Sequence, residues 1–279
     1  MQLKRLFLIP MLFFSFGYCQ MSQIEDWKPV KEAIQEASSD TWIFFDVDQV
    51  LIIPEDPLFH PSNDGLFRTY AEKLKKELNH EELMDLWGIV FSEVYPQVID
   101  LEVMDVLDLV KSRELKSYAL THCPTGKVGK IARFEDWRIK HLKSLGIHFD
   151  QLSFDSNEHY FTKMKGKYGI PVLKGGVIFA AHYDKGKVLG MVLDLLEKEP
   201  RSIIFIDDKI ENLESVELLC KERGTNFIGF EYRSQSCQTK VPLDLNLVDF
   251  RFETLKKEKK WLSDDEAEQA MLVLDSSKG

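Results

Sequence analysis

Short, continuous apolar runs alternate along this chain with longer segments in which apolar residues recur every three or four positions. The continuous runs are typical of strands buried on both faces of a parallel sheet, and the longer pattern is typical of amphipathic helices. The best candidate strands are residues 42–45, 117–120, 177–181, 202–206 and 227–230. We therefore expect an α/β fold, a three-layer Rossmann-like core with a central parallel sheet.

A helix-rich stretch lies between the first two of these strands. Helical patterns cover residues 66–78, 81–94 and 101–113. We interpret residues 56–113 as a helical cap inserted into a core that is formed by residues 20–55 and 114–279. Two further helices are expected beyond the cap, over residues 126–145 and 188–196.

Residues 1–19 have the pattern of a secretory signal peptide. Lys4 and Arg5 precede an apolar run that is shorter than the about 20 residues needed to span a bilayer, so a permanent anchor is the weaker interpretation. Cys19 also suggests a lipoprotein signal, but the bulky Tyr18 before it fits that processing poorly. We expect an exported protein (periplasmic, secreted or associated with the outer surface) that has no stable membrane span once the leader is removed.

The composition narrows the classes of partner and metal site. A formal charge of −10 repels nucleic acid and anionic membrane surfaces, so no nucleic-acid partner is expected. Without Cys19 the chain keeps Cys123, Cys220 and Cys237, whose spacing matches no zinc site and allows at most one disulfide.

Polar residues that could carry chemistry follow directly after three of the predicted strands. Asp46 and Asp48 follow the first strand, Thr121 the second, and Asp207 and Asp208 the fourth. In open α/β sheets, catalytic groups gather at the carboxyl ends of the strands, so these side chains converge if the strands are neighbours.

The string from Ile43 to Leu51, with its Asp-x-Asp after an apolar strand, resembles the first motif of the haloacid dehalogenase-like superfamily. Thr121, Lys185 and the Asp207-Asp208 pair match the other three motifs in the right order, and the resemblance covers roughly residues 41–235. Within that superfamily the chain is most similar to exported bacterial proteins of unassigned function in which a Lys-Gly pair precedes the last motif.

The resemblance implies a role for each of these residues in phosphoryl transfer. Asp46 would attack the phosphorus of a small phosphorylated substrate to form an aspartyl-phosphate, and Asp48 would protonate the leaving alkoxide and later take a proton from water. Thr121 and Lys185 would contact the phosphoryl oxygens. Superfamily members that cleave carbon–halogen bonds lack the second acid, so Asp48 favours phosphoryl chemistry.

The resemblance also implies a Mg²⁺ site with oxygen ligands. The ligands would be the Asp46 side chain, the Asp48 backbone carbonyl and the Asp208 carboxylate. Asp207 and Asn212 would fix the water ligands of the metal.

Each assignment has a simpler structural alternative. The aspartates could cap turns or helices, and Thr121 could cap a helix that begins near Pro124. Lys174 and Lys187 also precede the last motif, but Lys185 stands at a helix start with Asp184 as its N-cap, so we favour Lys185.

The sequence thus predicts an exported Mg²⁺-dependent phosphatase that acts on a phosphate monoester. One alternative is an exported binding or surface protein that has kept the fold and lost turnover, and another is phosphoryl transfer to an acceptor other than water by the same residues.

The leader generates a first testable expectation. The mature protein should begin near Gln20 and be recovered outside the cytoplasm, because Lys4, Arg5 and the apolar run direct export. N-terminal sequencing of the native protein checks this, and a native chain that still begins at Met1 would rule out cleavage.

Overall fold

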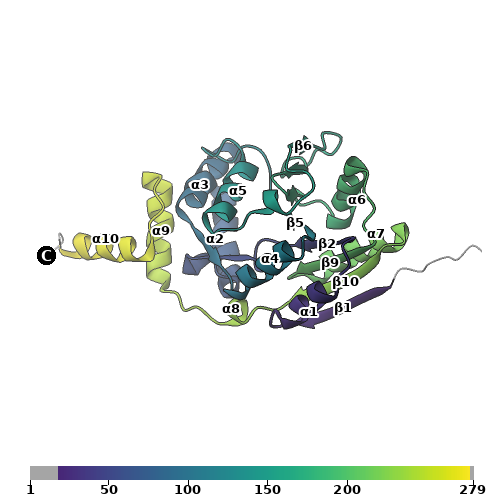
Figure 1. Cartoon of the computed structure of the whole chain (residues 1–279). Coiled ribbons are helices and arrows are strands. Elements are labelled where there is room, and N and C mark those ends of the chain that lie inside the picture. Colours follow the sequence, from purple (N-terminus) through teal and green to yellow (C-terminus); the bar gives the residue numbers. More distant parts are fainter. Residues whose placement is uncertain (1–17, 277–279) are drawn as a thin grey trace, which may run out of the picture.

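The computed structural model describes residues 18–276, which fold around one eight-stranded sheet with the strand order β1-β10-β9-β2-β5-β8-β7-β6 (Figure 1). The strands from β1 to β8 in this order pair in parallel, while β7 is antiparallel to both β8 and β6. The strands are β1 (Cys19–Ile24), β10 (Asn226–Tyr232), β9 (Ser202–Asp207), β2 (Thr41–Phe45), β5 (Lys116–Thr121), β8 (Val177–Phe179), β7 (Val172–Lys174) and β6 (His159–Tyr160). Residues 1–17, which carry most of the predicted leader, lie outside the described residues.

The central strand β2 sends alternate side chains to opposite faces of the sheet. Ile43 and Phe45 belong to one apolar cluster, Trp42 and Phe44 belong to another, and all four are buried. Burial on both faces explains why this strand reads as a continuous apolar run. The expected α/β fold with a largely parallel central sheet is confirmed.

Helices cover both faces of the sheet. The face that carries Ile43 and Phe45 is covered by α1 (Lys28–Glu36), α4 (Glu102–Ser112) and α5 (Phe134–Ser144). The face that carries Trp42 and Phe44 is covered by α6 (Lys185–Leu196) and α7 (Ile210–Arg223). The short 3-10 helix η3 (Phe149–Gln151) lies beside β5.

A smaller helical unit follows β2. It contains the 3-10 turns η1 (Pro57–Phe59) and η2 (Pro61–Asn63), the antiparallel pair α2 (Asp64–Glu77) and α3 (His80–Glu93), and a ribbon of β3 (Ile52–Pro54) with β4 (Pro96–Val98). The predicted cap boundaries at residues 56 and 113 stay a prediction. Within them, α2 and α3 share an apolar cluster of their own, while α4 packs on α1 and the sheet.

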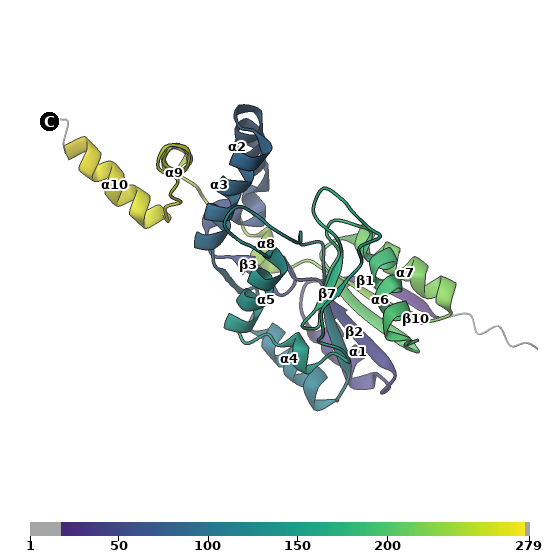
Figure 2. The ribbon, with the colours of Figure 1, turned by 90° about the horizontal axis from the view of Figure 1, so that it is seen from above.

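The C-terminal helix α9 (Leu245–Glu258) returns to this helical unit rather than to the sheet. Val248, Phe252 and Leu255 share a cluster with residues of α2 and α3, and Figure 2 shows α9 beside these helices. Arg251 is fully buried and bonds to the carboxylates of Asp56 and Asp264. The last helix, α10 (Asp264–Ser276), packs on α9, and the short α8 (Gln235–Gln238) lies in the connection that leads to α9.

The expectation of a helix over residues 126–145 is wrong in its first half, because α5 begins only at Phe134. Gly126 and Gly129 have positive φ angles of 84° and 54°, which end any helix. Gly129 also packs against α3 so closely that a Cβ there would lie 2.7 Å from the Met84 carbonyl oxygen.

No helix within residues 18–276 is both long enough and apolar enough to cross a membrane.

Gly186 sets the distance between α6 and α7. A Cβ at this position would lie 2.2 Å from the Ser215 carbonyl oxygen, and the Gly186 backbone N–H donates to Ser215 Oγ at 2.7 Å. Only glycine allows this approach, which fixes the start of α6 and therefore the position of Lys185.

We expect Gly186→Ala to lower the free energy of unfolding by about 1–3 kcal/mol, because the added methyl group must push α6 away from α7. Gly65 is the matched control: it lies in α2 with a negative φ, and a Cβ there meets nothing within 4 Å. Gly65→Ala should leave stability unchanged or raise it by at most about 1 kcal/mol. Urea unfolding of both variants checks this, and equal stabilities would show that the α6–α7 contact can relax freely.

Candidate active site

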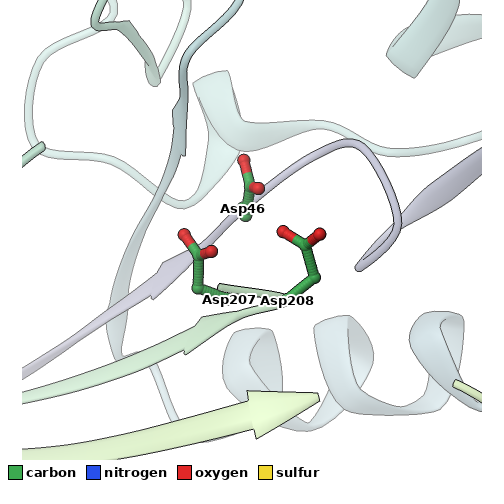
Figure 3. A group of neighbouring side chains, drawn as sticks. All are labelled: Asp46, Asp207 and Asp208. Carbon is green, nitrogen blue, oxygen red and sulfur yellow. The ribbon is translucent and has the colours of Figure 1, made fainter. Parts of the chain in front are cut away.

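The carboxyl ends of β2 and β9 bring three aspartates together. These strands are neighbours in register, and the Asp46 backbone N–H donates to the Ile206 carbonyl oxygen at 2.8 Å. One carboxylate oxygen from each of these residues, Asp46, Asp207 and Asp208, lies within 4.8 Å of the other two. Figure 3 shows the three side chains gathered around one point.

Lys185 neutralises part of this charge from the start of α6. Its side chain is fully buried, and its Nζ lies 2.9 Å from Asp46 Oδ1 and 2.6 Å from Asp207 Oδ2. Burial favours the neutral amine, but the two carboxylates outweigh that effect and raise the pKa of Lys185, which is therefore a cation at neutral pH.

The two other candidate lysines are elsewhere. Lys174 pairs with Asp136 and Glu158, and Lys187 is exposed at the surface, where its backbone N–H donates to the N-cap Asp184 at 2.7 Å.

Asp207 has protein partners on both carboxylate oxygens. Oδ2 accepts from Lys185, while Oδ1 accepts from Asn212 Nδ2 at 2.8 Å and from the Lys209 backbone N–H at 2.9 Å. This residue is fully buried and holds Lys185 in place. Asn212 acts on the site through Asp207.

Asp208 differs from its neighbour because one of its oxygens has no partner. Oδ1 is buried without a hydrogen bond within the described part of the chain, and Lys209 Nζ is 3.9 Å from Oδ2. Burial, and then the adjacent Asp46, raise the pKa of Asp208 to about 7. Burial, partly offset by Lys185, also raises the pKa of Asp46. A hard divalent cation fits this donor set, since it would satisfy the orphan oxygen and offset the repulsion between carboxylates.

Asp48 lies two residues after Asp46 and is held by Arg138 of α5. Arg138 Nη2 is 3.1 Å from Asp48 Oδ1, and the arginine side chain is only 13% exposed while that of Asp48 is 46% exposed. The adjacent Gln49 has a φ of 66°, which turns the chain sharply after Asp48. No motif predicts Arg138 as a site residue, because the pair joins positions 90 residues apart.

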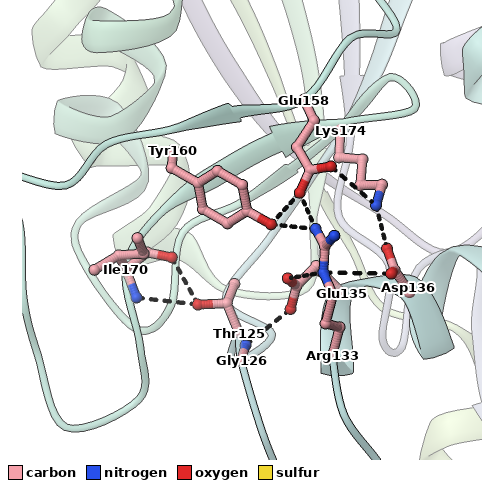
Figure 4. A network of polar contacts seen from close by, with 9 residues as sticks. All are labelled: Thr125, Gly126, Arg133, Glu135, Asp136, Glu158, Tyr160, Ile170 and Lys174. Carbon is pink, nitrogen blue, oxygen red and sulfur yellow. Dashed lines mark hydrogen bonds and ion pairs between the residues drawn. The ribbon is translucent and has the colours of Figure 1, made fainter.

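The first turn of α5, which positions Arg138, is anchored by the polar network of Figure 4. Arg133 Nε lies 3.1 Å from Glu135 and 3.3 Å from Asp136, and Glu135 accepts from the Gly126 backbone N–H at 2.8 Å. Lys174 of β7 reaches Asp136, so the network ties α5 to the edge of the sheet.

Thr121 is buried at the end of β5, beside β2. Its Oγ1 accepts from the Cys123 backbone N–H at 3.1 Å, which makes a local turn and leaves the hydroxyl proton for another acceptor. The helix expected to begin near Pro124 is absent from the described residues there, so Thr121 is not its cap.

Two histidines that the motifs did not indicate are stacked on each other, and the first of them, His122, interacts electrostatically with Lys185 and Asp46. The rings of His122 and His182 are stacked with their centroids 5.9 Å apart. Burial, and then the nearby Lys185 cation, lower the pKa of His122 to about 4, so this ring is neutral at neutral pH. Ala181 and His182 have positive φ angles of 49° and 62°, a conformation that is rare for residues other than glycine and concentrates at functional sites.

The family model described as "Protein of unknown function (DUF2608)" matches residues 23–268, and the chain therefore belongs to this family. A candidate outer membrane protein of Chlamydia pneumoniae is 20% identical in an alignment of 263 residues, and the match covers 88% of this chain and 92% of that protein.

Among solved structures, a haloacid dehalogenase-like family hydrolase from Streptococcus pneumoniae is similar with a TM-score of 0.35 and 14% sequence identity, over 68% of this chain and 93% of that one. A TM-score of this size supports no conclusion by itself, so the fold assignment comes from the sheet and helices described above.

The different surroundings of the two adjacent aspartates predict different effects on stability. Asp207→Ala removes the acceptor of three donors and leaves Lys185 buried with one carboxylate, so the free energy of unfolding should fall by about 3 kcal/mol. Asp208→Ala should be neutral or stabilising in the presence of chelator, because it removes a buried oxygen without a partner. Urea unfolding of both variants with chelator checks this, and an equal loss in both would contradict the division of roles.

Proposed function

We propose that this protein is a Mg²⁺-dependent phosphohydrolase that acts on a phosphate monoester, with Asp46 as a covalent nucleophile. The observation that carries the proposal is the buried Lys185 amine held between Asp46 and Asp207, beside an Asp208 oxygen that has no partner among the described residues. A cation, a carboxylate in reach of it and an open metal-ligating oxygen are what attack on a phosphate dianion requires. The resemblance of the four motifs to the haloacid dehalogenase-like superfamily supports the same chemistry.

Asp46 is oriented for attack by two contacts on one of its oxygens. Oδ1 is 2.9 Å from Lys185 Nζ and accepts from the Val47 backbone N–H at 2.8 Å, so we assign the attack to Oδ2. In the first step Oδ2 bonds to phosphorus while the bond from phosphorus to the leaving oxygen breaks and its electrons stay on that oxygen.

Asp48 would give its proton to the leaving oxygen and take one from water in the second step. Water then bonds to phosphorus, the bond from phosphorus to Asp46 breaks, and inorganic phosphate is released. The ion pair with Arg138 keeps the Asp48 side chain beside Asp46 in a partly exposed position that a leaving group can reach.

Three groups would stabilise the charge on the phosphoryl oxygens. Lys185 supplies a fixed cation, and Thr121 supplies a hydroxyl donor. Mg²⁺, held by Asp46, Asp208 and the Asp48 carbonyl, would add a divalent charge that draws the substrate dianion toward an acidic site.

We also propose that the protein is exported. The basic and apolar leader supports this, and so does the similarity to a candidate outer membrane protein. The strand β1 begins at Cys19, so cleavage after that residue would leave the rest of β1, from Gln20 onward, paired with β10.

Turnover of phosphate monoesters should require both Asp46 and Mg²⁺. Asp46→Asn should reduce kcat to background because it keeps the shape but loses the nucleophile, and chelator should do the same to the parent protein until Mg²⁺ is restored. Asp40→Asn is the matched control, since Asp40 is an exposed residue just before the same strand β2.

The measurement is phosphate release from a panel of monoesters, together with acid-stable trapping of the phosphorylated chain. Full activity of Asp46→Asn, or full activity without metal, would overturn the mechanism. A new phosphate ester of an added alcohol, formed in place of inorganic phosphate, would instead indicate transfer to that acceptor.

A further inference from the structure

A small apolar cavity lies next to Asp48, between the helical unit and the core. It has a volume of about 80 Å³ and is lined by Phe59 of η1, by Phe91 and Val94 at the end of α3, by Tyr95, and by Trp137 and Arg138 of α5. One water molecule needs roughly 10–15 Å³ on this measure, so the cavity can hold a group of about five to eight heavy atoms.

The position of Asp48 tells which part of a substrate this cavity faces. Under the proposed function Asp48 protonates the leaving oxygen, and Asp48 is also part of the cavity wall. The group attached to that oxygen, the alcohol part of the ester, therefore extends into the cavity, while the phosphoryl group stays beside Asp46 and Lys185.

The chemistry of the wall restricts the alcohol to an uncharged one. Aromatic and aliphatic side chains dominate the wall, and the charge of Arg138 is already balanced by Asp48. A second phosphate or carboxylate on the alcohol would lose its hydration without gaining a free cation.

Two polar atoms near the cavity have no hydrogen-bond partner among the described residues. Arg138 Nε and His141 Nδ1 are both buried in this way, and both residues line the cavity. Burial, and then the Arg138 charge, lower the pKa of His141 to about 4, so its ring is a neutral donor or acceptor at neutral pH.

We propose that this cavity is the leaving-group site and that the substrates are monophosphates of compact, uncharged alcohols, such as a single ring or a short branched chain. This inference rests on the proposed function, and it adds the substrate class. Burying a phenyl-sized group in such a wall should raise kcat/KM by about 30-fold over a substrate that cannot reach it.

The test compares benzyl phosphate, which fills the cavity, with methyl phosphate, which does not reach it. Both esters have alkyl leaving groups. We use the ratio of kcat/KM for benzyl phosphate to kcat/KM for methyl phosphate, because differences between variants in the folded fraction or in the rate of the chemical step cancel in it. The expected ratio is about 30 in the parent protein. A ratio near 1, with methyl phosphate turned over, would overturn the inference and leave the proposed function standing.

Two wall variants should lower the ratio by different routes. Val94→Phe fills the cavity and should bring the ratio of kcat/KM values below about 3. Tyr95→Ala removes part of the wall and should lower the ratio several-fold. The Tyr95 side chain is largely exposed, so its removal should not disturb the fold. Lys140→Ala is the matched control, an exposed position on α5 outside the wall, and should keep the parent ratio. An unchanged ratio in both wall variants would also overturn the inference.

A separate readout keeps the two proposals distinguishable. If the parent protein neither hydrolyses methyl phosphate nor exchanges phosphate oxygen with water, the proposed function fails. Binding of benzyl alcohol then tests, independently of turnover, whether the cavity is a binding site. A saturable shift of the Trp137 indole N–H resonance that Val94→Phe abolishes would support the cavity as a binding site. Absence of that shift in the parent protein would overturn it.

Discussion

The buried ammonium of Lys185 is the interaction on which the rest of the site depends. Removing such a group from water costs several kcal/mol, and only well-placed carboxylates offset that cost. Asp46 and Asp207 provide them from the ends of two adjacent strands, at 2.9 and 2.6 Å. Strands β2 and β9 and helix α6 must therefore hold one fixed arrangement, and the close contact of Gly186 with α7 maintains it. The stability of the core and the geometry of the nucleophile are set by the same ion contacts.

The Asp207-Asp208 pair shows how one strand end supplies two different functions. The two carboxylates lie in one cluster with Asp46 but have different partners. Asp207 accepts from Lys185, Asn212 and the Lys209 backbone, so both of its oxygens are occupied. Asp208 keeps one oxygen without a partner among the described residues. A protein with a formal charge of −10 can accept a phosphate dianion only where such local pairing has removed most of the repulsion.

The sequence predicted those parts that depend on local pattern. The five predicted strands are present because buried parallel strands read as apolar runs, and the aspartates lie where such strands end. The edge strand β1 was not predicted, since Gln20, Ser22 and Gln23 give it no apolar run. The placement of Arg138 and of the stacked histidines could not be predicted either, because these contacts join segments far apart in the chain. The sequence favoured Lys185 among the three lysines because of its place at a helix start, but the burial of its amine between two carboxylates is a property of the packed molecule.

The packing of α9 on α2 and α3 has a consequence for the order in which the molecule can assemble. The apolar surface of α2 and α3 is covered by Val248, Phe252 and Leu255, which are synthesised after all the strands of the sheet. A chain that emerges with its N-terminus first therefore leaves α2 and α3 uncovered until α9 has also emerged. Arg251, which bonds to Asp56, then joins the two ends of that unit. The helical unit is therefore complete only after every strand of the sheet has been synthesised.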